Sequence, residues 1–296
     1  MRPLRPSPIP SQIFAMKTYC SPRFFTLAQG IRAALLGAIG SLVMPGQMAA
    51  ADALPLAAPV ALFNGRNLDG WNVYVQNQPA GAKQDIFQIS DGVIHVYKNA
   101  PDGSPQPFGY LLTSEEHSDY QLTLEYKWGV KKFAPRADAD SVRDAGVCYH
   151  VRAPDEIWPI GVECQIQEGD TGDVWAIHTQ ATSHIHPDNM NYWPPDKPGR
   201  VEATKGDNPR GYQRFLRSYC YEKEGWNRIV LIVRGDTATY VINGHVANRV
   251  TGLKYWDASA SQWQPLTKGK ILLQAEGAEI FYRNITLQPL APLPTS

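Results

Sequence analysis

Most of the chain after about residue 55 consists of short runs in which apolar and polar residues alternate. This period-two pattern indicates β-strands with one buried and one polar face, and no long helix-period segment interrupts it. The turn signals Asp91-Gly92 and Asn243-Gly244 separate such runs, and Asn-Gly favours a hairpin because both residues tolerate positive φ. Roughly a dozen short strands predict an all-β domain of two stacked antiparallel sheets.

The alternation also predicts which side chains share a face. In the run IGVECQIQ (160–167), a glutamate and two glutamines alternate with valine, cysteine and isoleucine. If the clearest runs are neighbouring strands, one face carries acids, bases and amides that can bind hydroxyls and move protons. The predicted face comprises Glu125, Lys127, His150, Arg152, Glu163, Gln165, Gln274 and Glu276. A merely solvated outer face is the competing explanation.

The alternation lapses between residues 176 and 219, where the chain is rich in histidine, proline, asparagine and glycine. So long an irregular segment inside a compact domain is usually functional or covers a site. We therefore expect this segment to be irregular and to lie near the functional residues.

Charge and the N-terminus narrow the possible partners. Twenty-eight basic residues balance 28 acidic ones in 296, so no global field would attract nucleic acid. Basic residues, a short apolar run (33–44) and small residues near 49–53 predict a signal peptide over 1–52. The apolar run is too short to span a bilayer, although an uncleaved anchor is the alternative. We expect an exported protein, periplasmic or extracellular, without stable membrane insertion after cleavage.

The predicted organisation is thus a signal peptide, one β-sandwich domain over 55–290 and a disordered tail over 291–296. Removing the signal peptide leaves Cys148, Cys164 and Cys220. An odd number allows at most one disulfide, so a disulfide-stapled scaffold is excluded. All three lie in apolar or aromatic runs and are expected to be packed thiols.

Several motifs together carry a resemblance to a known family. They are LFNGRNLDGW (62–71), GYLLTSEEHSDYQLTLEYKW (109–128), DAGVCYHVRAPDEIWPIGVECQIQEGDTGD (144–173), GWNRIVLIVRGDTATYVINGHVANRV (225–250) and ILLQAEGAEIFYRNI (271–285). In this order they resemble the bacterial domain of unknown function 1080, also described as 3-keto-glycoside 1,2-lyase, hydratase or hydrolase domains. The resemblance implies a concanavalin A-like (laminarinase-like) β-sandwich jelly roll that acts on glucosides oxidised at C3. Many members carry Arg where His150 stands, and Asp-His where Ala275-Glu276 stands.

The implied chemistry assigns roles to the polar face. A ketone at C3 acidifies the proton on C2, so a base can remove it and the enolate can expel the aglycone from C1. We expect His150 or Glu163 to be the base, and Lys127, Arg152 and Gln165 to donate hydrogen bonds to the ketone or enolate oxygen. Glu125 would orient Lys127. The remaining predicted substrate-binding residues are Trp158, Gln274 and Glu276. The expected partner is a small carbohydrate, and no organic cofactor is expected.

Two other functions remain open at this point. The spacing Glu163-x-Gln165-x-x-Glu168 is similar to the E-x-D-x-x-E signature of laminarinase-like retaining glucanases, but it needs a bulge to bring Glu168 onto the face of Glu163. A non-catalytic sugar-binding module could instead stack Trp158, Trp175 or Trp193 on a pyranose ring.

A divalent metal also remains open as a cofactor. His184 and His186 lie two apart in SHIHP, and Asp170 and Asp173 lie in the glycine-rich turn EGDTGD. A metal beside His150 and Glu163 could polarise the ketone. Hydrated loop histidines and an Asp-capped turn are the simpler explanations for these clusters.

Overall fold

The computed structural model describes residues 58–78, 86–152 and 156–291. The predicted signal peptide and the predicted tail beyond residue 291 lie outside these ranges, so both remain predictions. In the described part of the chain, no helix has the length and apolar character needed to cross a bilayer.

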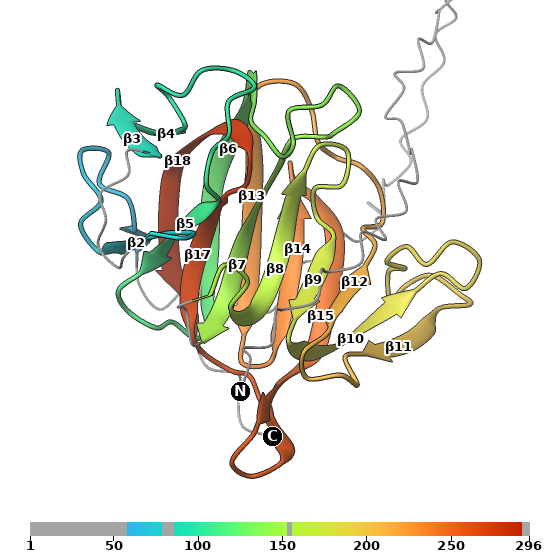
Figure 1. The fold of residues 1–296 in the computed structure, drawn as a ribbon. Helices are drawn as coiled ribbons and strands as arrows, with labels where there is room; N and C mark the ends of the chain where they lie inside the picture. The colour runs from blue at the N-terminus through green and yellow to red at the C-terminus, as the bar shows by residue number, and fades with distance from the viewer. Residues whose placement is uncertain (1–57, 79–85, 153–155, 292–296) are drawn as a thin grey trace, which may run out of the picture. The chain divides into compact units, whose positions relative to one another are not determined.

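Two antiparallel sheets lie face to face (Figure 1). The seven-stranded sheet has the order β12-β9-β8-β7-β17-β5-β2. Its strands are β2 (Trp71–Val75), β5 (Gly109–Thr113), β7 (Asp144–Arg152), β8 (Ile160–Gln167), β9 (Val174–Ile177), β12 (Tyr212–Phe215) and β17 (Lys270–Ala275). This sheet is nearer to the viewer in Figure 1.

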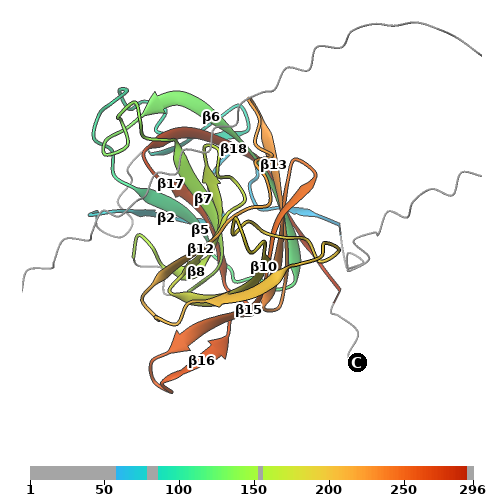
Figure 2. The same cartoon turned by 90° about the vertical axis from the view of Figure 1, so that its right-hand side faces the viewer.

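The eleven-stranded sheet has the order β11-β10-β15-β14-β13-β6-β18-β4-β3, with β1 paired to β18 and β16 paired to β15. Its strands are β1 (Val60–Ala61), β3 (Phe87–Ser90), β4 (Val93–Val96), β6 (Tyr120–Lys132), β10 (Thr179–Ile185), β11 (Val201–Lys205), β13 (Asn227–Arg234), β14 (Thr237–Ile242), β15 (His245–Asp257), β16 (Gln262–Pro265) and β18 (Ala278–Pro289). The hairpin of β15 and β16 extends beyond the two layers (Figure 2). The predicted all-β sandwich of two antiparallel sheets is confirmed.

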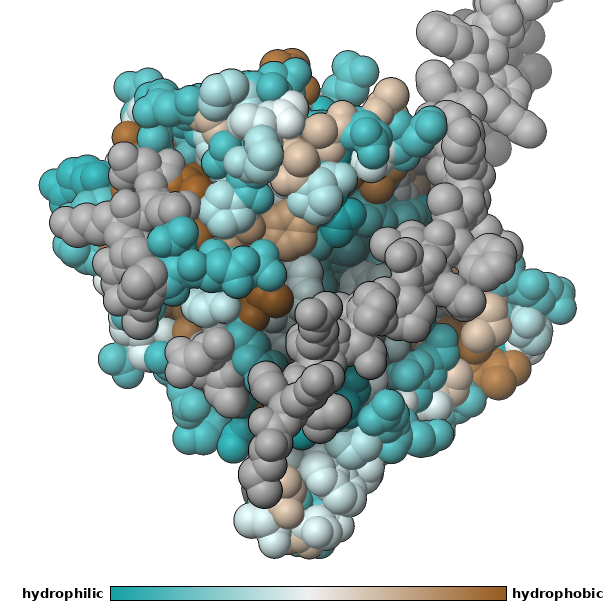
Figure 3. Space-filling view, viewed as in Figure 1, coloured by the Kyte–Doolittle hydropathy of each residue, from teal (hydrophilic) through white to brown (hydrophobic). Residues whose placement is uncertain are grey.

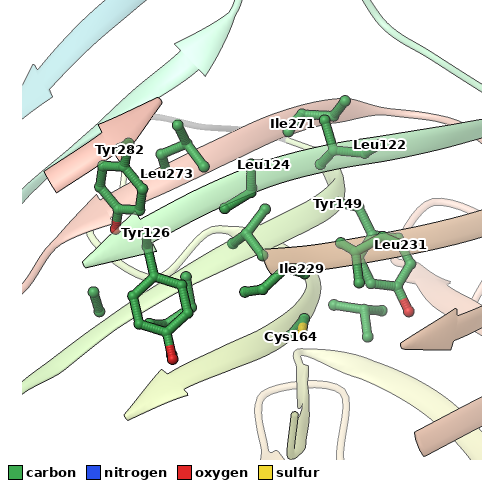
Figure 4. Close-up of a cluster of buried hydrophobic side chains, with 14 of the residues drawn as sticks. Leu122, Leu124, Tyr126, Tyr149, Cys164, Ile229, Leu231, Ile271, Leu273 and Tyr282 are labelled. Carbon is green, nitrogen blue, oxygen red and sulfur yellow. The ribbon is translucent and has the colours of Figure 1, made fainter. Parts of the chain in front are cut away.

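The space between the sheets is filled by the apolar positions that alternation predicts. Leu122, Leu124 and Tyr126 of β6 are fully buried, and side chains of β13, β7 and β8 surround them (Figure 4). A fully buried leucine contributes about 1.5–3 kcal/mol through removal of its surface from water. The hydroxyl of Tyr240 donates to the hydroxyl of Tyr149 at 3.0 Å, so a polar contact crosses this core as well.

The expectation of an irregular segment over 176–219 is wrong, because β10, β11 and β12 lie within it. β11 is an edge strand and its residues are exposed or half-buried on both faces. A strand with two wet faces needs no apolar alternation, which explains why the sequence pattern misses it.

Candidate functional site

The outer face of the seven-stranded sheet, which points away from the other sheet, carries a polar group of side chains. Glu163 and Gln165 lie on β8, Gln274 lies on β17, and Glu276 follows β17 directly. Along the two strands they alternate with Val162, Cys164 and Leu273, which are buried between the sheets. The structure thus brings these four predicted site residues onto one face, while their chemical roles remain predictions.

Gly146 of β7 makes room at the centre of this face. It pairs with Gln165 across β7 and β8. A Cβ atom at position 146 would overlap both Oε1 of Glu163 and Oε1 of Gln274. The absence of a side chain therefore allows the glutamate and the amide to converge above the strand.

Arg136 joins two further carboxylates at the same end of the sheet. Its Nη2 lies 2.6 Å from Oε1 of Glu276 and 2.8 Å from Oδ2 of Asp144. Oδ2 of Asp144 also accepts a hydrogen bond of 2.8 Å from the side-chain amide of Gln167. Asp144, Glu163 and Glu276, hereafter the carboxyl cluster, therefore share this end of the face with one directly paired cation.

Burial and mutual repulsion raise the pKa values of the three groups in the carboxyl cluster. Burial, and then the charges of Glu276 and Asp144, raise the pKa of Glu163 well above its usual value. Burial and the charge of Asp144 raise the pKa of Glu276 to about 8, although Arg136 opposes the shift. The pKa of Asp144 rises to about 6, mainly through burial. Such a cluster offers a strongly basic carboxylate and a protonated acid at the same pH.

Polar atoms without partners are concentrated around this cluster. Five buried side-chain atoms of the face form no hydrogen bond with any part of the chain that the structure describes: Arg136 Nε, Asp144 Oδ1, Glu163 Oε1, Trp175 Nε1 and Gln274 Oε1. Buried polar groups are normally paired. Donors and acceptors gathered in this way suit a ligand that carries several hydroxyl groups.

Aromatic rings flank the carboxyl cluster. Trp175 on β9 pairs with Glu163 across the sheet, and the guanidinium of Arg214 lies 5.3 Å from its ring. On the other side, Tyr74 and Tyr110 stack at 4.6 Å. The predicted residue Trp158 packs beside this face, with its ring 6.3 Å from that of Phe108. Figure 3 views this face and shows hydrophilic atoms in a recess near its centre.

The acidic turn after β8 holds the arginine of this face. Arg214 donates from Nε to Asp173 at 2.6 Å and from Nη2 to Asp170 at 2.8 Å, while Arg217 pairs with the same two carboxylates. Asp170 and Asp173 as metal ligands are therefore wrong, because two guanidinium groups occupy their oxygens. The turn is itself anchored, since Glu222 accepts a hydrogen bond of 2.7 Å from the amide of Gly169.

The two histidine candidates for a metal each contact another side chain. His184 lies 3.6 Å from Glu202 on the neighbouring strand, and the ring of His186 packs 4.5 Å from that of Trp193. Among residues 58–78, 86–152 and 156–291, no group of three His, Cys, Asp or Glu side chains could hold a metal ion.

His150 does not lie beside Glu163, so its predicted place on the outer face is wrong. β7 carries a register shift between Tyr149 and Arg152, and His150 has a φ of 54°. The bulge reverses the alternation, so His150 turns toward the opposite sheet. Its Nε2 donates to the carbonyl of Gly235 at 2.9 Å and its side chain is fully buried. Val151 takes the outward position instead.

Arg152, Glu125 and Lys127 are also misplaced by the simple alternation. The same bulge turns Arg152 toward β15, where its guanidinium lies 3.9 Å from the ring of Tyr255. Glu125 and Lys127 lie on β6, which belongs to the eleven-stranded sheet. Glu125 accepts a hydrogen bond of 2.8 Å from Arg283 there. Their strand is not a neighbour of β8, so they lie on the opposite outer face of the sandwich.

The buried position of His150 predicts acid sensitivity. Burial lowers its pKa from 6.5 to about 4. Between about pH 6.5 and pH 4, His150 is protonated in the unfolded chain but not in the folded chain. The free energy of unfolding therefore falls as the pH drops through this range, by about 3 kcal/mol in all. The free energy of unfolding, measured in urea at several pH values across this range, should fall with decreasing pH less steeply in His150→Gln than in the unmodified protein. The difference should be about 1.4 kcal/mol per pH unit. The same pH dependence in both proteins would contradict the lowered pKa of His150.

The predicted glucanase pair does not form. Glu168 lies beyond the end of β8, is exposed, and pairs with Arg143 at 2.7 Å. No register shift is present within the β8 pairings that would return it to the face of Glu163.

Four functional candidates were absent from the sequence prediction, namely Arg136, Asp144, Gly146 and Arg214, while Trp175 was named only for the sugar-binding alternative. Asp144 and Gly146 have the same parity as Cys148 in β7, so alternation could have found them. Trp175 alternates with the buried Val174 and Ala176. Arg136 lies in a loop, where no sequence pattern indicates its direction.

Comparisons with known proteins give one family match. The profile of the 3-keto-alpha-glucoside-1,2-lyase-like domain matches residues 58–288. A search of curated proteins gives no match. A candidate glycosyl hydrolase from Parabacteroides distasonis is 19% identical, with a TM-score of 0.46, over 79% of this chain and 100% of that chain. A beta-glucanase from Bacillus licheniformis is 10% identical, with a TM-score of 0.41, over 79% and 99%.

A carbohydrate binding module from Bacillus subtilis is 9% identical, with a TM-score of 0.39, over 74% of this chain and 95% of that chain. Structural similarity at these levels carries no information about activity. The family profile, in contrast, spans most of the sequence. The chain belongs to the 3-keto-alpha-glucoside-1,2-lyase-like domain family and is a carbohydrate-active protein.

Proposed function

We propose that the protein is an enzyme that cleaves 3-keto-glucosides by removing the proton on C2 and eliminating the aglycone from C1. Addition of water to the unsaturated sugar would make the net reaction a hydrolysis. The carboxyl cluster is the observation that supports this proposal best, because it combines a basic carboxylate with a protonated acid on a face lined by aromatic rings. We also propose that the chain is exported, in line with its N-terminal sequence.

Glu163 is the proposed base. Its Oε1 forms no hydrogen bond within the described residues, so a lone pair is free to take a proton from carbon. The pKa of Glu163 is raised, which makes its ionised form a stronger base than an exposed carboxylate. The C–H bond at C2 breaks, its electrons form the enolate with C3, and the proton goes to Glu163.

The enolate oxygen requires hydrogen-bond donors. Gln165 uses its own Oε1 to accept from the amide of Ile166 at 3.1 Å, which leaves its NH2 group as a donor. Arg136 contributes positive charge and an unpaired Nε among the described residues. In this proposal Gln165 keeps the donor role expected from the sequence, and Arg136 replaces Lys127 and Arg152.

Glu276 is the proposed acid. With a pKa of about 8 it stays protonated at neutral pH and can give its proton to the departing oxygen. The C1–O bond then breaks as the C3 ketone reforms and a C1–C2 double bond appears. Turnover should therefore decline on the alkaline side of about pH 8, where Glu276 loses its proton.

Deuterated water tests this chemistry. A 3-keto-glucoside incubated with the protein should release its aglycone and acquire deuterium at C2 in the remaining substrate or the hydrated sugar, as read by mass spectrometry. Formation of a saturated sugar without deuterium at C2 would contradict proton abstraction and would indicate direct hydrolysis.

A non-catalytic sugar-binding protein is the second candidate, favoured by the stacked Tyr74 and Tyr110 beside the polar floor. Such a protein would bind unmodified oligosaccharides by calorimetry and would release no aglycone from a 3-keto-glucoside. Unlike the lyase, it would need no protonated carboxyl group.

A further inference from the structure

A hollow of about 360 Å³ opens where Arg152 of β7 and Ile160 of β8 lie close to the end of β15. It is lined by Glu116, Arg152, Ile160 and residues 255–258. This size falls within the lower range of small-molecule sites, about 300–1,000 Å³. The hollow, hereafter the end hollow, contains none of the residues of the carboxyl cluster.

The end hollow is separate from the candidate active site. Ile160 and Glu163 are three residues apart on β8, so they point to opposite faces about 10 Å apart along the strand. The bulge in β7 likewise turns Arg152 away from the outer face. A ligand in the end hollow would therefore not occupy the position of the reacting sugar.

The guanidinium of Arg152 is held in a fixed position beside the end hollow. Its guanidinium lies 3.9 Å from the ring of Tyr255, which fixes its plane. It makes no hydrogen bond with the described residues, so its N–H groups remain available as a planar fork of donors. Tyr255 and Trp256 are themselves fixed, because they pair with β16 and Trp256 packs 5.5 Å from Trp263.

Charge favours a neutral ligand. Glu116 is paired with Lys268 at 3.0 Å, and Asp257 offsets the single charge of Arg152. Oδ1 of Asp257, a residue that lines the hollow, accepts hydrogen bonds from Ser259, which leaves Oδ2 as a further acceptor. Aromatic walls with an arginine and a carboxylate of balanced charge suit the rings and hydroxyls of a neutral saccharide.

We propose that the end hollow is a second, non-catalytic binding site for a neutral saccharide, with Arg152 and Asp257 contacting hydroxyl groups and Trp256 contacting the ring. The site would hold unoxidised sugar near the carboxyl cluster without taking part in cleavage. It does not depend on the reaction proposed above.

Tryptophan indole signals in proton–nitrogen NMR spectra test the proposal. Cellobiose, a neutral unoxidised disaccharide, is the probe, and Trp256→Phe identifies the Trp256 signal. Cellobiose at millimolar concentration should shift this signal saturably, and Arg152→Ala should weaken the binding by about tenfold or more. Glu163→Gln, which alters only the candidate active site, should leave the shift unchanged.

Three outcomes would overturn the proposal: no saturable shift at Trp256, a shift that survives Arg152→Ala, or a shift that disappears in Glu163→Gln. Tighter binding of glucuronate than of cellobiose would also contradict a neutral ligand. Cleavage of a 3-keto-glucoside by Arg152→Ala should match that of the unmodified protein. This measurement distinguishes a failure of the proposed saccharide binding from a failure of the proposed enzyme activity.

Discussion

Glu163→Gln should reduce turnover of a 3-keto-glucoside by about a hundredfold or more, because the amide cannot accept the C2 proton. The two side chains have nearly the same shape, and the raised pKa of Glu163 shows that its environment already favours the uncharged form. We therefore expect the melting temperature to stay the same or to rise. The measurements are initial rates of aglycone release and deuterium incorporation at C2, which should fall together.

Glu168→Gln is the matched control for this change. Glu168 follows the same strand but is exposed and pairs with Arg143 away from the outer face. Its replacement should leave turnover close to that of the unmodified protein. Full activity in Glu163→Gln, or an equal loss in both variants, would remove Glu163 from the mechanism.

At pH values above about 8, where both groups are ionised, Arg136→Met is expected to give the largest loss of stability, about 3–5 kcal/mol, because it leaves two nearly buried carboxylates without their common counter-charge. Without the guanidinium the pKa values of Asp144 and Glu276 should rise further, so the variant should regain stability as pH falls. Chemical denaturation at several pH values measures both effects.

A second substitution makes this result specific. Above about pH 8, adding Glu276→Gln to Arg136→Met removes one of the two uncompensated charges and should restore part of the lost stability. Arg143→Met, which breaks an exposed pair, should cost less than about 1 kcal/mol. If Arg136→Met were no more harmful than Arg143→Met, the carboxyl cluster would not depend on its arginine.

The period-two alternation was sufficient for β8 and β17, where each strand keeps its register and one face is apolar. It therefore predicted that Glu163, Gln165, Gln274 and Glu276 would share a face. It failed for Glu125 and Lys127 because alternation gives the face of a strand but not its sheet. Strand order depends on contacts between distant segments, such as the pairing of β6 with β18 and β13.

Other parts of the site could not be read from strand periodicity at all. The bulge at His150 depends on a single backbone conformation with positive φ, for which histidine gives no clear signal. Arg136 lies in a loop and pairs with Glu276, and Arg214 lies on the edge strand β12, whose place in the sheet depends on its pairing with β9. The EGDTGD turn was noticed as a possible cation site, and its oxygens do bind cations, but these are guanidinium groups of the chain itself.

The bulge in β7 also matters to anyone who wishes to alter which sugars the protein accepts. Up to Cys148 the strand presents every second side chain to the ligand, whereas beyond the bulge it is Val151 that borders the apolar patch formed with Leu112 and Ile177. A mutant library that follows simple odd-and-even numbering would therefore randomise interior packing instead of specificity. The positions chosen for mutation in β7 should therefore be even-numbered before His150 and odd-numbered after it.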